Sequence, residues 1–231
     1  MQHVVVDRAE WLQARKVLLA KEKEFTRLRD EMTKQVRSLP WEKVEKDYTF
    51  EGPDGLETLA DLFGHHSQLA VYHFMLGPGW EQGCPSCSFL ADSFDGTPMH
   101  LARRGVSFVA VSRAPLTEIE AYKRRMGWSF KWVSSDGSDF NYDFGVSFDK
   151  QDIDAGNARY NYAPASSIGD EMPGASFFYK DGDAISHTYS TYGRGLDILI
   201  GTYNWLDLAP KGRDEDSLDY TMAWVRRHDE Y

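Results

Sequence analysis

Cysteine is scarce in this chain of 231 residues, and the two that occur, Cys84 and Cys87, are separated by only two residues. A pair so close in sequence does not cross-link distant parts of a fold, so a disulfide-stapled scaffold is excluded and a chemical or metal-binding use is favoured. Long hydrophobic runs are also lacking. The longest, residues 69–76, contains His73 and is far shorter than the roughly 20 residues of a membrane helix. We therefore expect no membrane partner.

Positive charge is in the minority as well. The chain has 26 Lys and Arg against 36 Asp and Glu, which gives a formal net charge of −10 at pH 7. Nucleic-acid binding depends on basic side chains that neutralise phosphates, so we expect no nucleic-acid partner. The first dozen residues carry Asp7, Arg8 and Glu10, which does not fit the basic-then-apolar plan of a secretory signal. A cytoplasmic location is expected.

Residues 9–36 contain neither proline nor glycine, and apolar residues recur there mostly every three or four positions. This pattern predicts one long amphipathic helix, capped by Asp7 and followed by Pro40. The apolar stripe either packs on the outside of the domain or forms the contact of a homodimer. We expect three parts: the N-terminal amphipathic helix in residues 1–40, a main domain in residues 41–210, and a charged C-terminal tail in residues 211–231 that ends in a short helix over residues 220–227.

The main domain alternates strands and helices. The predicted strands are residues 48–50, 56–58, 69–76, 106–112, 130–134, 176–180 and 184–190, and the predicted helices run from the cysteine pair to about residue 103, then over residues 117–126 and 196–208. The long stretch between residues 136 and 173 is expected to carry short elements of its own. Strand, helix, strand, helix, hairpin and helix is the thioredoxin order. It predicts an α/β fold, a three-layer sandwich with a mixed central sheet.

The cysteine pair lies between the first buried strand and the helix that follows it. Pro85 suits the first helical position, so Cys84 should lie at the helix N-terminus, where free backbone amides and the helix dipole lower the pKa of a thiol. Cys87 lies one turn further on the same face, within reach of a disulfide. Cys84 is therefore predicted to be the nucleophile and Cys87 the more buried resolving cysteine.

Other uses of the pair remain as alternatives. A structural zinc site needs four ligands, and the sequence has no second Cys-x-x-Cys and no histidines at ligand spacing. A c-type haem would need His after Cys87, but Ser88 stands there. Inert buried thiols are the third alternative. We expect no metal and no bound cofactor.

Four further residues are candidates for substrate binding. Met172 and Pro173 directly precede a strand, at the place where the thioredoxin architecture has a cis-proline facing the redox pair, and we predict a cis bond between them. Arg113 follows the second buried strand, at the sheet edge where ligands of α/β proteins bind, and is a candidate to stabilise the Cys84 thiolate. Trp80 is a candidate for an aromatic substrate groove.

Several segments together resemble a bacterial thioredoxin-like family of unknown function, whose members are described as predicted dithiol-disulfide oxidoreductases. They are residues 48–62, 73–75, 83–92, 109–115, 138–144, 187–192, 194–197 and 210–214. The likeness covers nearly the whole chain, including the first helix, and implies the thioredoxin fold. The sequence differs from thioredoxin in having Gly83 before the first cysteine, and from the peroxiredoxins in having Gly77 and Glu81 at positions where those proteins carry Pro and Thr or Ser.

The leading hypothesis is a thiol-disulfide oxidoreductase that acts on a protein or small-molecule disulfide through a mixed disulfide with Cys84, which Cys87 resolves. A thiol peroxidase, in which Cys84 passes through a sulfenic acid, is the rival enzyme. A redox-inert binding module on the same scaffold is the rival from another class.

Overall fold

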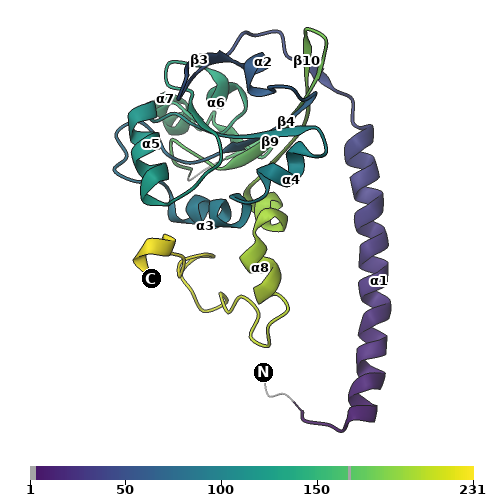
Figure 1. The fold of residues 1–231 in the computed structure, drawn as a ribbon. Helices are drawn as coiled ribbons and strands as arrows, with labels where there is room; N and C mark the ends of the chain where they lie inside the picture. The colour runs from purple at the N-terminus through teal and green to yellow at the C-terminus, as the bar shows by residue number, and fades with distance from the viewer. Residues whose placement is uncertain (1–3, 166–167) are drawn as a thin grey trace. The chain divides into compact units, whose positions relative to one another are not determined.

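The computed structural model describes residues 4–165 and 168–231 and divides the chain into two units, Met1–Pro40 and Trp41–Tyr231 (Figure 1). The first unit contains the helix α1 (Arg8–Ser38), where Asp7 accepts a hydrogen bond from the backbone amide of Glu10 at 2.9 Å. The predicted long helix is confirmed, and its role as a dimer contact stays a prediction. Within the described residues, no helix combines the length and the apolarity that crossing a membrane requires.

The second unit is built on one mixed sheet with the strand order β1-β10-β9-β4-β5-β6-β2-β3. At its centre, β4 (Gln68–His73), β5 (Val106–Ser112) and β6 (Trp132–Ser134) run parallel to one another. The antiparallel strands on one side are β9 (Gly174–Asp181), β10 (Ala184–Tyr192) and β1 (Glu42–Lys43), and those on the other are β2 (Thr49–Gly52) and β3 (Gly55–Thr58). This topology is that of a thioredoxin-like fold, as the sequence predicts.

Helices cover both faces of this sheet. On one face, α3 (Pro85–Phe94) and α5 (Leu116–Arg125) enclose a core that contains Tyr72, Phe74 and Cys87. On the other face, α2 (Leu59–Leu62) and α6 (Phe140–Asp143) enclose a second core with Leu69 and Val71. Alternate residues of β4 thus point into different cores, which explains the unbroken apolar character of this strand. The three-layer sandwich is confirmed.

Short elements fill the stretch between α6 and β9, as expected. They are α7 (Lys150–Asp154) and the two-stranded sheet of β7 (Arg159–Tyr160) and β8 (Ala163–Pro164). The helix predicted from the cysteine pair to residue 103 is two helices, because α3 ends before Gly96 and α4 (Pro98–Ala102) begins at a proline. The predicted closing helix is likewise split into the 3-10 helix η1 (Gly193–Leu199) and α8 (Gly201–Leu206).

The helix predicted over residues 220–227 is wrong. Met222 has a φ of 70°, which no residue of a right-handed helix adopts, and its amide donates to the Glu215 side chain at 3.1 Å. Side-chain contacts organise this end of the chain, among them Trp224 against Phe89 and Arg227 with the Gly83 carbonyl. Its regular element is the short 3-10 helix η2 (His228–Glu230).

Candidate functional site

The cysteine pair lies where the chain passes from β4 to α3. The Cys84 amide donates to the Met75 carbonyl at 3.1 Å, so the intervening loop returns to the end of the strand. Cys84 is the N-cap of α3 and Pro85 its first residue, as predicted. Cys84 is half-buried and Cys87 is 1% exposed, and the two free cysteines lie 4 Å apart. A partly exposed thiol, Cys84, therefore lies beside a buried one, Cys87.

The pKa values of the two thiols are shifted in opposite directions. A hydrogen bond from the Cys87 thiol lowers the pKa of Cys84 to about 6, with further support from the backbone amides of Cys87 and Ser86 and from the charge of Arg227, although burial opposes this shift. Burial raises the pKa of Cys87 well above its usual range, and the neighbouring Cys84 adds to the effect. At neutral pH the pair therefore carries its negative charge on Cys84.

Two tyrosines act on the cysteine pair, of which Tyr72 is buried and Tyr160 is half-buried. Tyr72 of β4 hydrogen-bonds to Cys87, and burial together with both cysteines raises the pKa of its phenol. Tyr160 of β7 donates to the Pro173 carbonyl at 2.7 Å and accepts from the Gly193 amide at 2.8 Å. Burial raises the pKa of Tyr160, and Cys87 adds to the effect. Both phenols are neutral donors near neutral pH.

A cation reaches the site from the far end of the chain. Arg227, which is 8% exposed, donates from Nη2 and Nε to the Gly83 carbonyl at 2.6 and 3.1 Å. Its Nε also donates to the Tyr122 hydroxyl at 3.1 Å, and its Nη1 pairs with Glu230 at 3.1 Å. The residue directly before Cys84 is thus bound to a buried guanidinium.

The hydroxyl groups of Tyr122 and Ser88 connect Arg227 to the backbone of Cys84. The Ser88 hydroxyl donates to the Cys84 carbonyl at 2.9 Å and lies 2.8 Å from the Tyr122 hydroxyl. Because Ser88 uses its one proton on Cys84, Tyr122 must donate to Ser88. Arg227, Tyr122 and Ser88 therefore form one directed chain of hydrogen bonds that ends on the first cysteine.

The predicted site residue Arg113 has different partners. Its Nε lies 2.5 Å from the Glu171 carboxylate, its Nη1 donates to the Tyr142 hydroxyl, and the ring of Tyr142 lies under the guanidinium. Ser147 donates to the other Glu171 oxygen at 2.8 Å. Burial raises the pKa of Glu171, while Arg113 acts against that shift. The guanidinium is occupied by this buried ion pair.

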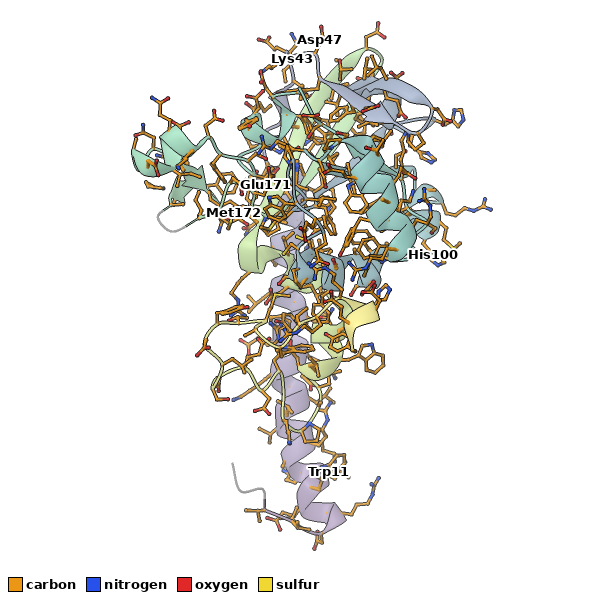
Figure 2. The ribbon with its side chains drawn as sticks, turned by 90° about the vertical axis from the view of Figure 1, so that its left-hand side faces the viewer. Trp11, Lys43, Asp47, His100, Glu171 and Met172 are labelled. Carbon is orange, nitrogen blue, oxygen red and sulfur yellow. The ribbon has the colours of Figure 1, made fainter. Side chains whose placement is uncertain are left out.

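Trp80, Met172 and Pro173 lie around the same strand ends. A side chain at Gly77 would meet the Trp80 indole nitrogen at 3.1 Å and Glu171 at 3.2 Å, so both residues flank the loop before Cys84. Glu171 and its neighbour Met172 lie near the middle of the second unit (Figure 2). Met172 and Pro173 are half-buried, and the Pro173 carbonyl accepts a hydrogen bond from Tyr160.

The predicted cis bond between Met172 and Pro173 is wrong, because the described residues contain no cis peptide bond. Trans is the lower-energy isomer even before proline. Hydrogen bonds hold the segment on both sides of this bond: the Met172 amide donates to Val146 at 2.8 Å and the Pro173 carbonyl accepts from Tyr160.

A cavity of about 700 Å³ lies beyond the Arg113–Glu171 pair, with Tyr142 and Ser147 in its wall. Its lining also includes four acidic residues, Asp139, Asp143, Asp149 and Asp152, and one basic residue, Arg159. In residues 4–165 and 168–231, no three His, Cys, Asp or Glu side chains gather in a way that would hold a metal ion.

Sequence reasoning missed the groups that surround the cysteines. Arg227 lies in the predicted tail, and no local sequence pattern marks it as a site residue. Tyr72 and Tyr122 are indistinguishable from ordinary core residues in the sequence. Glu171, which directly precedes Met172 and Pro173, carried one usable signal: a carboxylate beside a predicted site segment.

Solved structures similar to this chain include thioredoxin-fold proteins. A peroxidoxin, BcpB from Mycobacterium tuberculosis, is 13% identical with a TM-score of 0.49, and the match covers 70% of this chain and 94% of that one. A mutant of PrxQ from Xylella fastidiosa is 13% identical with a TM-score of 0.44, over 70% and 88% of the two chains. Peroxiredoxin Q from Xanthomonas campestris is 16% identical with a TM-score of 0.44, over 68% and 90%.

No curated protein matches the sequence. A family model does, and it spans residues 1–231. The resemblance that the sequence segments suggest is confirmed by this match. The chain belongs to the family described as bacterial protein of unknown function (DUF899).

Proposed function

We propose that this protein is a thiol-disulfide oxidoreductase whose substrates are protein or small-molecule disulfides. The observation that carries the proposal is the asymmetry of the cysteine pair. Cys84 begins a helix, is half-buried and has its pKa lowered to about 6, whereas Cys87 is buried with its pKa raised. A nucleophilic thiolate beside a protected thiol is what a two-step disulfide exchange requires.

The reaction balances as two exchanges. The Cys84 thiolate attacks one sulfur of the substrate disulfide, a mixed disulfide forms, and the other substrate sulfur leaves as a thiolate that takes up a proton. Cys87 then loses its proton and attacks the Cys84 sulfur, the bond between Cys84 and the substrate breaks, and the second substrate sulfur leaves as a thiolate that takes up that proton. The substrate gains two electrons, and the protein ends with a Cys84–Cys87 disulfide. A dithiol reductant returns the pair to the free thiols by the reverse exchange.

The resolving step needs a rise in the reactivity of Cys87. Once Cys84 is in a mixed disulfide, its negative charge is gone, and with it the repulsion that contributes to the raised pKa of Cys87. Tyr72 and the region of Met75 then supply the hydrogen bonds that favour a Cys87 thiolate. The second thiol is thus activated by the completion of the first step.

Turnover of insulin disulfides with dithiothreitol as reductant tests the proposal, with hydrogen peroxide consumption measured in parallel. We expect insulin reduction by the unaltered chain, its loss in Cys84→Ser, and a trapped mixed disulfide in Cys87→Ser. Thiol counting should show two thiols after reduction and none after mild oxidation. Turnover of peroxide alone would replace the proposal by a thiol peroxidase, and turnover of neither substrate by a redox-inert binding module.

A further inference from the structure

The last ten residues of the chain are anchored against α3, the helix that begins at the cysteine pair. Trp224 packs on the ring of Phe89 with centroids 5.5 Å apart, and Val225 is 3% exposed within the same core. His228 lies 2.7 Å from the Asp92 carboxylate. In Figure 1 the yellow C-terminal segment lies next to α3. This end of the chain is therefore part of the wall around the site.

A second set of contacts ties the same segment to the loop before Cys84. Arg125 of α5 pairs with Asp229 at 2.7 Å and Glu230 at 3.1 Å, and it donates to the Gln82 side chain at 2.8 Å. Gln82 and Gly83 are thus held from two sides, by Arg125 and by Arg227. The position of Arg227 is set by tertiary contacts on both of its flanks.

From this arrangement we infer that Arg227 is a positioning residue of the cysteine site: its guanidinium fixes the Gly83 carbonyl directly before Cys84 and supplies a buried positive charge to the Cys84 thiolate. The inference rests on the proposed function, in which that thiolate is the nucleophile. A buried cation acts more strongly than an exposed one, because little water screens it.

Other titratable groups lie around Cys84 and Arg227, and their signs decide what a change at Arg227 does. Cys87 of α3 and Tyr72 of β4 act on the cysteine site, Tyr122 of α5 and Glu230 of η2 contact Arg227, and Arg125 of α5 also pairs with Glu230. The hydrogen bond from Cys87 is the largest cause of the lowered pKa of Cys84, and the charge of Arg227 adds to it. Glu230 partly neutralises Arg227 and therefore works against this effect.

The test is the rate of iodoacetamide alkylation against pH in chains whose one remaining thiol is Cys84, made with Cys87→Ser. We expect Arg227→Gln to raise the measured pKa of Cys84 by about one pH unit, which lowers the rate at pH 5 about tenfold. Arg227→Lys should restore most of the rate, because it keeps the charge. The matched control is Arg226→Gln, which removes the same charge from the exposed neighbouring residue.

A second variant, with the opposite expected effect on the pKa of Cys84, keeps the inference testable if Arg227→Gln does not fold. Glu230→Gln removes the carboxylate that offsets Arg227 and should lower the pKa of Cys84. If Arg227→Gln fails to fold, the direction of this change decides. Equal profiles for Arg227→Gln and Arg226→Gln, or an unchanged or higher pKa in Glu230→Gln, would overturn the inference. Alkylation involves no disulfide substrate, so this outcome is independent of whether insulin is turned over.

Discussion

The Arg113 guanidinium forms an ion pair with the Glu171 carboxylate at 2.5 Å, and the side chain of Glu171 is only 2% exposed. The two residues are 58 positions apart and meet beside the loop that leads to Cys84. Burying both charges has a desolvation cost that their attraction offsets only while both are present. The pair therefore supports the architecture of the strand ends, and it leaves the role of cation at Cys84 to Arg227.

Removal of Arg113 should destabilise the fold and leave Cys84 unaffected. Arg113→Ala strands the buried Glu171 carboxyl, and we expect a loss of about 3 kcal/mol in the free energy of unfolding, measured with urea. The alkylation profile of Cys84 should not shift. Arg194→Ala is the control, because this arginine is 80% exposed in its pair with Asp197 and its loss should cost less than about 1 kcal/mol. A shifted Cys84 profile in Arg113→Ala would contradict the assignment.

The acidity of Cys84 should depend on a hydrogen-bond donor at position 87. The Cys87 thiol is the largest cause of the lowered pKa of Cys84. Cys87→Ser keeps a donor and should retain a pKa near 6, whereas Cys87→Ala removes it and should raise the pKa toward the usual value of about 8.5. The ultraviolet absorbance of the thiolate, followed against pH, measures both pKa values. Identical titrations of the two variants would show that the hydrogen bond is unimportant.

His73 should make stability pH-dependent. It is 1% exposed, its Nε2 lies 2.8 Å from the Ser176 hydroxyl, and burial lowers its pKa to about 3 with a contribution from His187. Below pH of about 6.5 the unfolded chain protonates this histidine while the folded chain does not, so the unfolded state binds more protons and stability falls. Between pH 6.5 and pH 5 the loss from this group is about 2 kcal/mol.

The comparison that isolates this contribution is His73→Gln, which should flatten the fall in the free energy of unfolding between pH 7 and pH 5. His100→Gln, at an exposed position on α4, should keep the full slope. Parallel slopes for His73→Gln and the unaltered chain would mean that His73 titrates alike in both states.

Gly83 should tolerate no side chain. A Cβ there would stand 2.6 Å from a ring carbon of Phe74 and 2.7 Å from one of Tyr122. Gly83→Ala is expected to cost about 1–3 kcal/mol by overpacking and to lower the reactivity of Cys84, because Arg227 binds the carbonyl of this residue. Gly96→Ala is the control, since nothing lies within 4 Å of a Cβ at that position. Thermal unfolding and alkylation rate measure the two effects, and equal stability of both variants would refute the packing argument.

Features that depend on neighbours along the chain can be predicted from the amino-acid sequence. The long helix in residues 9–36 follows from its periodicity and its lack of proline and glycine, and the start of α3 follows from Pro85 after Cys84. The order of strands and helices was sufficient for the thioredoxin-like sheet, because short connections and right-handed crossovers leave few topologies. The helix predicted near residue 220 fails for the complementary reason: tertiary contacts override a weak local preference there.

The charges that lie near the cysteines follow from contacts between distant parts of the chain. Arg113 and Arg227 carry the same charge. In the sequence Arg113 is the better candidate for the cysteine site, because it follows the end of a predicted buried strand. In the folded chain Arg113 forms an ion pair with the buried Glu171. Arg227 instead donates a hydrogen bond to the carbonyl of Gly83, 144 positions away. Electrostatic partners are set by distance and burial in three dimensions, and neither follows from the separation of two residues along the chain.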